Sequence, residues 1–398
     1  MLGAELERRC TDACALPGRA AASLARLLSD QAAIIDERDE RLSMVHMTYL
    51  EALVVGFIQG ITELFPVSSL GHNVLIPALV GGSWATDLNV AAPQSPYLAF
   101  IVGLHVATAI GLMIYFWRDW VRIIIGFLTS IRDRDVRTTD QKLAWMLIVA
   151  TIPVGLAGVL FEHEFRVVFG VPIRAAIFLI VNGLILFAGE RFRTRRSRQA
   201  DAELEQQRVA VVLQREPAPP ERERVASAPG SPPPGTPAAA GAAAGAGLPA
   251  SPAGHRTARQ EEIDLAIAAD ERLTQRSYLD AVLIGAAQIL ALLAGISRDG
   301  VTMVAGMFDG LSREDAARFA FLLATPVILA AGALKVPDLI QYGHGIHGQI
   351  LAGSILSGVG AYISVRFLVR YFRTRTLTPF AIYCVVFGLA SVLYLQLK

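Results

Sequence analysis

The chain of 398 residues is 53% hydrophobic, with a mean hydropathy of +0.46, which is too apolar for an ordinary soluble protein of this length. Its formal net charge of +1 gives no reason to expect a nucleic-acid partner. The three cysteines, Cys10, Cys14 and Cys384, have the spacing of neither a metal site nor a disulfide framework. The composition predicts an integral membrane protein.

Residues 1–46 are rich in Arg and of mixed charge, and they lack the continuous apolar segment of a cleavable signal peptide. Met44 and Met47 stand directly before the first apolar segment. We expect residues 1–46 to be an N-terminal extension that is either disordered or upstream of the natural start codon.

Long apolar segments follow, and several run for 18 or more residues, enough to span a hydrocarbon core of roughly 30 Å. They cover 48–66, 97–117, 143–161, 174–190, 278–295, 316–336, 350–369 and 379–397. Two further apolar stretches, 73–81 and 301–308, are too short to cross a bilayer and follow breaks rich in Gly, Pro and Ser. We expect re-entrant helices there, since irregular backbone at membrane depth is tolerated only where it is buried or lines a wet cavity.

The composition changes between these two groups of apolar segments. Residues 217–255 are rich in Pro, Ala and Gly and cannot bury a core. We predict a disordered linker over 199–276, with room for short helices at its charged ends. It would separate a first membrane repeat, 47–198, from a second, 277–398.

The two halves are related in sequence. A shift of 229 positions lays 56–81 over 285–310, with six identities in 26 positions. The identical pairs are Gly56 and Gly285, Gln59 and Gln288, Leu64 and Leu293, Ser68 and Ser297, Gly71 and Gly300, and Gly81 and Gly310. Paired, interrupted apolar segments of this kind indicate a binding site near the bilayer midplane of an inverted-repeat protein.

The distribution of basic residues tests this topology. If 48–81 and 278–310 are re-entrant hairpins and the other six segments cross, the basic loops all lie on one side, while the opposite loops hold only Arg166. The basic side holds Arg118, Arg122, Arg132, Arg134, Arg137, Lys142, Arg191, Arg193, Arg195, Arg196, Arg198, Arg370, Arg373 and Arg375. The positive-inside rule assigns that side to the cytoplasm. Three crossings per half invert the second repeat relative to the first. A layout in which all eight long segments cross stays open.

The first polar motif, QGITELFPVSSLGH, begins at Gln59. Gln59 and Glu63 are four residues apart and share one face of a helix. Ionisable side chains inside membrane segments are costly and usually functional, although an Arg partner that fixes helix packing would also explain Glu63.

The rest of the motif predicts a tight turn that opens another helix. Pro66 ends the first helix, and Ser68, Ser69, Gly71 and His72 follow. The free N–H groups and the dipole at such a helix start favour an anion. We expect one of the two serines to cap the helix, and a buried structural role is the alternative for His72.

The second motif, GISRDG, lies at the equivalent turn of the second half and contains Ser297, Arg298 and Asp299. The planar guanidinium of Arg298 suits a phosphate, because its fork can bind two oxygens at once. The alternative is an ion pair with Glu63 or Asp299 and no ligand. Thr302 is expected to cap the following helix or to contact the ligand.

Together the motifs supply a carboxylate, hydroxyl groups, a histidine, an arginine and helix N-termini. This set suits the binding and cleavage of a phosphoanhydride, which needs a nucleophile or water, a base and charge neutralisation at the transferred phosphoryl group. Transport alone does not require the Ser and His side chains.

The two motifs, in this order and in matching halves, resemble those of the undecaprenyl-diphosphate phosphatase family, the bacitracin-resistance type of bacterial inner-membrane enzyme. The resemblance covers 48–190 and 278–397. It implies an all-α integral membrane protein with an inverted repeat, six spanning helices and two re-entrant hairpins, and a site that opens to the outer face. It also implies hydrolysis of undecaprenyl diphosphate to undecaprenyl phosphate and phosphate, which recycles the lipid carrier of peptidoglycan synthesis and confers bacitracin resistance.

The resemblance also implies the roles of individual residues. It assigns catalysis to Glu63, Ser69, His72 and Arg298. It assigns substrate contacts to Ser68, Gly71, Ser297, Gly300 and Thr302. It assigns a divalent cation, Mg²⁺ or Ca²⁺, to Gln59, Glu63 and Asp299. The sequence leaves the nucleophile open between Ser69, His72 and a water molecule.

This chain departs from the family pattern at four positions. Many members have Glu at the position of Gln59 and Ser or Thr at the position of Leu70. They usually have Pro at the position of Ala294 and Ser at the position of Asp299. Asp299 either restores the missing carboxylate or neutralises Arg298. A related polyprenyl diphosphate therefore stays open as the substrate.

A polyprenyl-phosphate transporter or flippase without hydrolase activity is the alternative function, since the repeat and an arginine at membrane depth suit either. A mere membrane anchor explains neither motif. The other class of lipid phosphatases needs a histidine several residues after a Ser-Arg pair, and none follows Ser297 and Arg298. The expected partners are the polyprenyl lipid and the bilayer, and a homodimer stays open.

Overall fold

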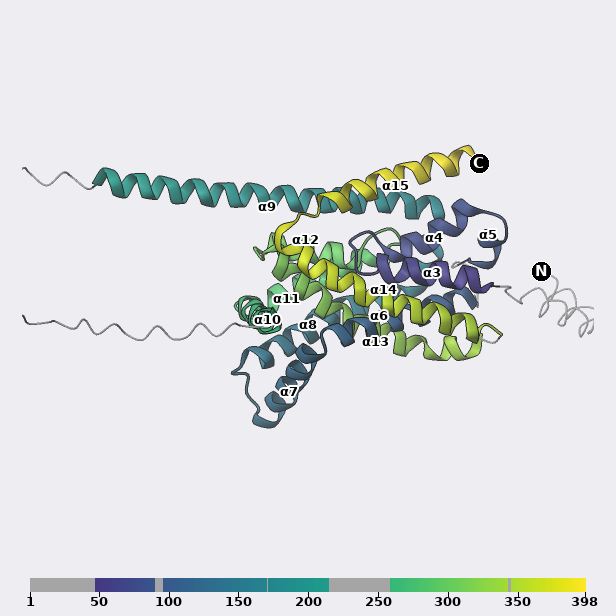
Figure 1. Cartoon of the computed structure of the whole chain (residues 1–398), viewed down its shortest axis with the longest axis horizontal. Coiled ribbons are helices and arrows are strands. Elements are labelled where there is room, and N and C mark those ends of the chain that lie inside the picture. Colours follow the sequence, from purple (N-terminus) through teal and green to yellow (C-terminus); the bar gives the residue numbers. More distant parts are fainter. Residues whose placement is uncertain (1–46, 90–95, 170, 215–257, 343–344) are drawn as a thin grey trace, which may run out of the picture.

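The computed structural model describes residues 47–89, 96–169, 171–214, 258–342 and 345–398 (Figure 1). The N-terminal extension predicted over 1–46 and the centre of the predicted linker, 215–257, lie outside the described residues. Within the described ranges all regular elements are helices and no strand occurs. The prediction of an all-α protein is therefore confirmed.

The first half contains α3 (Tyr49–Thr62), α4 (Ser69–Val80), α5 (Ser83–Asp87), α6 (Pro96–Tyr115), α7 (Trp117–Asp133), α8 (Thr139–Phe169) and α9 (Pro172–Gln214). The second half contains α10 (Ala258–Thr274), α11 (Tyr278–Ala286), the 3-10 helix η1 (Ala287–Leu292), α12 (Arg298–Phe308), α13 (Arg313–Tyr342), α14 (His347–Thr374) and α15 (Thr378–Leu397).

Six helices of the described chain, α6, α8, α9, α13, α14 and α15, are long and apolar enough to cross a membrane, with mean hydropathies of 1.5 to 2.2 in their most apolar windows. Many of their large apolar side chains are exposed, among them Leu160, Ile355 and Val386. Such exposure suits lipid-facing surfaces. The prediction of a multi-pass membrane protein with six spanning helices is confirmed. That the shorter pairs, α3 with α4 and α11–η1 with α12, are re-entrant hairpins stays a prediction.

The short helices of each half pack against a long helix of the bundle. A Cβ atom added to Gly56 of α3 would collide with the backbone of Gly353 in α14. A Cβ atom added to Gly285 of α11 would collide with the backbone of Ala150 in α8. In both cases the long helix belongs to the other half of the chain. Gly56 and Gly285 are an equivalent pair in the sequence repeat, and small residues let membrane helices approach closely. The exchanged packing agrees with a repeat, and the inversion itself stays a prediction.

The basic stretches gather at one end of the bundle, at the left in Figure 1. There α9 extends past the other helices, and α7, α10 and the connection from α14 to α15 lie nearby. The stretch 118–142, predicted as a basic loop, contains most of the amphipathic helix α7. We refer to this end of the molecule, which carries 118–142, 191–198 and 370–378, as the basic end.

Part of the predicted linker is helical. Helix α9 continues to Gln214, and α10 covers the end of the linker. Leu273 and Asp270 of α10 are almost completely buried against the bundle. Arg272 forms two hydrogen bonds, of 2.9 and 2.6 Å, with the carboxylate of Asp315 in α13. The charged end of the linker is thus packed against the membrane domain.

Candidate functional site

The two polar motifs meet inside the bundle. Glu63 caps the C-terminus of α3, and Arg298 is the first residue of α12. The Nη2 atom of Arg298 donates a hydrogen bond of 2.9 Å to Oε1 of Glu63. The side chains of Arg298 and Glu63 are only 15% and 5% exposed. Residues 235 positions apart therefore form one buried polar site.

Glycine and serine hold the two turns against each other. Ser68 has a φ of +68°, in the left-handed region, and its Oγ accepts hydrogen bonds of 3.2 Å from the backbone N–H groups of Gly71 and Gly295. A Cβ atom on Gly71 would lie 2.9 Å from the Cα atom of Gly295. Gly295 itself has a φ of +112°. The contact therefore requires glycine on both sides.

Asn182 of α9 connects the same two turns. Its Nδ2 donates a hydrogen bond of 3.0 Å to the carbonyl of Pro66, and its Oδ1 accepts one of 2.9 Å from the N–H of Ser297. Asn182 is completely buried. The sequence reasoning missed this residue, and the available signal was a single amide inside an apolar segment.

The carboxylate of Glu63 is the centre of the site. Its Oε2 accepts a hydrogen bond of 2.7 Å from Nε2 of Gln59 and a short one from the hydroxyl of Ser69. The Nε2 atom of His105 lies 3.3 Å from the same oxygen. With Arg298 on Oε1, four side chains converge on one carboxylate. The structure thus brings the predicted residues Gln59, Glu63, Ser69 and Arg298 together.

His105 of α6 is the second functional candidate that the sequence reasoning missed. Its Nδ1 contacts the carbonyl of Ile101 at 2.8 Å, while its Nε2 faces Glu63. Both ring nitrogens thus face acceptors, and only the imidazolium can donate to both. The signal was present, because His105 is a lone ionisable side chain in a predicted span, as Glu63 is.

His72 is oriented differently from this cluster. Its Nδ1 donates to the carbonyl of Ser68 at 2.7 Å, and its Nε2 accepts from the hydroxyl of Tyr383 at 2.7 Å. The ring also stacks on Tyr383 and Phe387, with centroid distances of 5.8 and 5.2 Å. Both ring nitrogens are therefore engaged by groups other than Ser69, which suits a structural role.

The remaining predicted contacts of the second motif shape the start of α12. The Oγ of Ser297 accepts a hydrogen bond of 3.1 Å from the N–H of Gly300, and the hydroxyl of Thr302 donates one of 2.7 Å to the carbonyl of Arg298. Gly300 also lies close to Pro66 of the first motif. These three residues fix the turn that presents Arg298.

The predicted metal ligands do not fit a resident cation. The Oε1 of Gln59 accepts a hydrogen bond of 2.7 Å from Asn73, so Gln59 presents its amide N–H group to Glu63. Arg298 and His105 already contact Glu63. Asp299 is buried and accepts from Nε of Arg298 at 3.4 Å, while its Oδ2 has no hydrogen-bond partner among the described residues. No cluster of three or more His, Cys, Asp or Glu side chains suited to a metal occurs in the described part of the chain.

The fold and the site define a class. The chain is an all-helical, multi-pass membrane protein with a buried site in which a serine hydroxyl is hydrogen-bonded to a carboxylate beside an arginine. A hydroxyl next to a base is the arrangement that activates a nucleophile, and the arginine can neutralise a phosphate.

Comparison with known proteins gives the family. The family model described as bacitracin resistance protein BacA matches residues 52–214 and 252–390. The chain belongs to this family, as its two motifs predicted.

Curated relatives cover most of the chain. A protein of Mycolicibacterium paratuberculosis named undecaprenyl-diphosphatase is 54% identical over 354 residues, 89% of this chain and 99% of the relative. Undecaprenyl-diphosphatase 2 of Frankia alni is 50% identical over 358 residues, 87% of this chain and 97% of the relative. Undecaprenyl-diphosphatase 2 of Chromobacterium violaceum is 35% identical over 353 residues, 87% of this chain and 99% of the relative.

Proposed function

We propose that this chain hydrolyses undecaprenyl diphosphate to undecaprenyl phosphate and inorganic phosphate. The observation that carries the proposal is the hydrogen-bonded series Ser69, Glu63 and Arg298. It supports roles for these residues as nucleophile, base and phosphate-binding cation. The names of the relatives favour this activity over the flippase alternative. In a bacterium the reaction recycles the lipid carrier of peptidoglycan synthesis and gives resistance to bacitracin.

Binding of the diphosphate begins with Arg298. A guanidinium has five N–H donors, and the contacts to Glu63 and Asp299 use only Nη2 and Nε. The other donors are available to the phosphate oxygens. The starts of α4 and α12 add positive dipole ends on the two sides of the site.

Catalysis then proceeds through Ser69. Its hydroxyl donates to Glu63, so that the carboxylate accepts the proton as Oγ attacks the terminal phosphorus. The bond to the bridging oxygen breaks, and undecaprenyl phosphate leaves with the electron pair. A water molecule then attacks the phosphorus of the phosphoserine, and the bond between phosphorus and Oγ breaks. Glu63 returns its proton to Oγ, and phosphate is released with the protons of the water, so that serine and carboxylate are restored. Arg298 and the cationic His105 stabilise the charge on the transferred group.

The divalent cation needs a different account from the one predicted. Because Gln59, Glu63 and Asp299 do not fit a resident ion, we propose that Mg²⁺ or Ca²⁺ enters with the diphosphate. Mg²⁺ commonly takes substrate phosphates as ligands together with one or two carboxylates. Equilibrium dialysis of Mg²⁺ with and without a non-hydrolysable diphosphate analogue tests this: tight binding without the analogue would contradict it.

The orientation in the membrane is also a proposal. The basic end of the bundle would face the cytoplasm of a bacterial plasma, or inner, membrane, with the site accessible from the outer side. Labelling of single cysteines introduced in 82–89 and 134–138 with an impermeant reagent on intact cells would test it. A homodimer stays a separate proposal, tested by the mass of the detergent-solubilised protein in light scattering.

The activity is tested with purified protein and undecaprenyl diphosphate in the presence of Mg²⁺. We expect release of phosphate from the wild type and loss of release in E63Q, S69A and R298Q variants that remain folded. A well-folded wild type that releases no phosphate but moves the lipid across vesicles would favour the flippase.

A further inference from the structure

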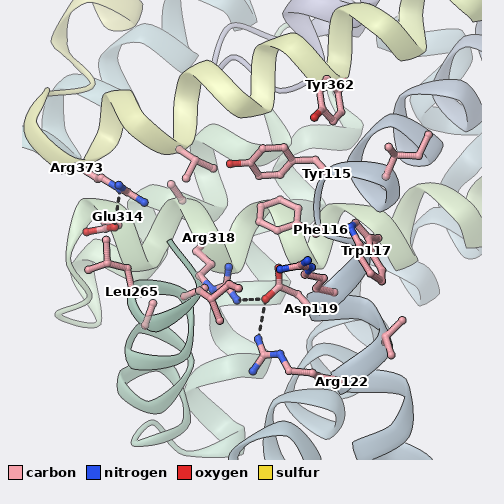
Figure 2. A pocket seen from close by; sticks show the side chains of 18 residues that line it. Tyr115, Phe116, Trp117, Asp119, Arg122, Leu265, Glu314, Arg318, Tyr362 and Arg373 are labelled. Carbon is pink, nitrogen blue, oxygen red and sulfur yellow. Dashed lines mark hydrogen bonds and ion pairs between the residues drawn. The ribbon is translucent and has the colours of Figure 1, made fainter. Parts of the chain in front are cut away.

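A cavity lies at the basic end of the bundle, away from the two motifs. It has a volume of about 510 Å³ and is enclosed by the end of α6, by α7 and α10, by the start of α13 and by the end of α14 (Figure 2). None of its lining residues belongs to either polar motif. The cavity therefore needs an explanation of its own.

One wall of the cavity is formed by an ion-pair network in which arginines and aspartates pair with one another. Arg122 and Arg318 both contact the carboxylate of Asp119, at 2.7 and 2.8 Å (Figure 2). Both also contact the completely buried Asp270 of α10, at 2.9 and 2.8 Å. A further acid, Asp140, lies 3.1 Å from Arg122. These arginines are largely neutralised by their own partners and hold the cavity in shape.

Two other arginines that line the cavity are less strongly paired with acids. Arg118 lies 5.2 Å from the ring of Trp117 and has no ion pair with an acid among the described residues. Arg373, at the end of α14, makes a contact of 3.2 Å with Glu314, and both side chains are about 30% exposed. An exposed ion pair of this kind is weak and can open toward a stronger anion. The lining of the cavity thus contains one weakly paired cation from α7 and one from α14.

The outer wall of the cavity is apolar. Ile114, Trp117 and Val121 line it with side chains that are 58%, 54% and 47% exposed. The same face of α7 continues with further exposed apolar side chains, which are those of Ile124, Ile125, Leu128 and Ile131. The opposite face carries Arg and Asp residues. A helix of this kind, at the end of a transmembrane bundle, lies in the membrane interface.

The cavity therefore combines weakly paired cations with an adjacent apolar surface. We propose that it lies at the depth of lipid headgroups and binds the phosphate headgroup of an anionic phosphodiester lipid. The phosphate would contact Arg118 and Arg373, and the acyl chains would lie against Ile114, Trp117 and the apolar face of α7. A soluble anion would use the arginines but would leave that apolar wall uncovered.

The test uses the full chain in detergent after removal of bound lipid. Native mass spectrometry measures the dissociation constant of the first bound lipid, for phosphatidylglycerol and for phosphatidylcholine with the same acyl chains. We expect the wild type to prefer phosphatidylglycerol. R118Q should weaken phosphatidylglycerol binding about fivefold and R118Q/R373Q about 30-fold, because each arginine near a lipid surface contributes about 1 kcal/mol.

The matched control is R132Q/R137Q, which removes the same charge from exposed arginines near the same end and outside the cavity. It should leave phosphatidylglycerol binding unchanged. R118Q breaks no ion pair with an acid in the described chain, so a folded variant is expected even if the double variant is unstable. Equal binding of the two lipids, or unchanged binding in R118Q, would overturn the proposal. Equally tight binding of glycerol 1-phosphate would assign the cavity to a soluble anion instead.

Discussion

The arginine–carboxylate cluster at the basic end and the one at the junction of the two motifs differ in what surrounds the charges. At the basic end, Arg122, Arg318, Asp119 and Asp270 contact one another and connect α7, α10 and α13. At the junction of the motifs, Arg298 contacts Glu63 and Asp299, and the carboxylate of Glu63 also contacts a serine hydroxyl, a histidine and an amide.

The comparison shows that a buried ion pair alone does not mark a reactive site. The network at the basic end satisfies its charges internally, which is the usual structural use of such groups. The site has a nucleophile on its carboxylate, turns that require glycine, and an Asp299 oxygen without a hydrogen-bond partner in the described chain. These three features, which accompany the ion pair of Glu63 and Arg298, indicate a catalytic site.

The largest expected effect is a loss of kcat when the cluster at the junction of the motifs is altered. S69A and E63Q should each lower kcat by about 10³-fold or more, because nucleophile and base act as a unit. The double variant should be hardly slower than either single variant. Phosphate release measures this, with S391A, which removes another buried hydroxyl, as the control. A double variant in which the two losses multiply would show that Ser69 and Glu63 act independently.

The next effect sharpens the role of Arg298. R298K keeps the charge but loses the planar fork, so we expect kcat/KM to fall about 100-fold. The control is R276K, which alters a half-buried pair with Asp309 outside the site. Wild-type kinetics in R298K would mean that charge alone is needed there.

A third change affects stability at the basic end. D270N removes the completely buried carboxylate that contacts both Arg122 and Arg318 and should lower the free energy of unfolding by about 3 kcal/mol, with kcat of the folded enzyme unchanged. Thermal unfolding in detergent and phosphate release measure the two quantities. The control, R132Q, breaks an exposed pair and should change stability by less than about 1 kcal/mol. A loss of kcat in folded D270N would connect the two clusters.

The smallest effect concerns His72. Because both of its ring nitrogens are engaged by Ser68 and Tyr383, H72N should reduce kcat less than about tenfold, well below the effect of S69A. The two variants are compared in the same assay of phosphate release. A loss in H72N as large as that in S69A would make His72 the nucleophile or the base.

The sequence predicted the parts of the site that carry unusual residues. Glu63 and Arg298 were recognised because ionisable groups are rare in apolar segments. The internal sequence repeat predicted that the turns that carry them lie close together. His105 and Asn182 were missed, because a single polar residue in a span becomes part of a site only through helix packing. The metal ligands were predicted from the family resemblance. The hydrogen bond from Asn73 to the amide oxygen of Gln59, which turns the amide N–H group toward Glu63, could not be inferred from sequence spacing.

The fold was predicted less evenly. Length and hydropathy were sufficient for the six spanning helices, since the bilayer sets both. The helical spacing of Trp117, Val121 and Ile124 was visible in the sequence, but the surrounding arginines led to the prediction of a loop. The packing of α10 depends on Asp270 meeting two arginines from distant helices, which composition cannot show.

The central claim is that Ser69 attacks the terminal phosphorus with Glu63 as its base. The stereochemical course at that phosphorus tests it directly, with undecaprenyl diphosphate whose terminal group is a chiral, isotopically labelled thiophosphate. Two successive in-line transfers, through a phosphoserine at Ser69, predict overall retention of configuration. Inversion would mean that water attacks the substrate in one step, which would contradict a nucleophilic role for Ser69.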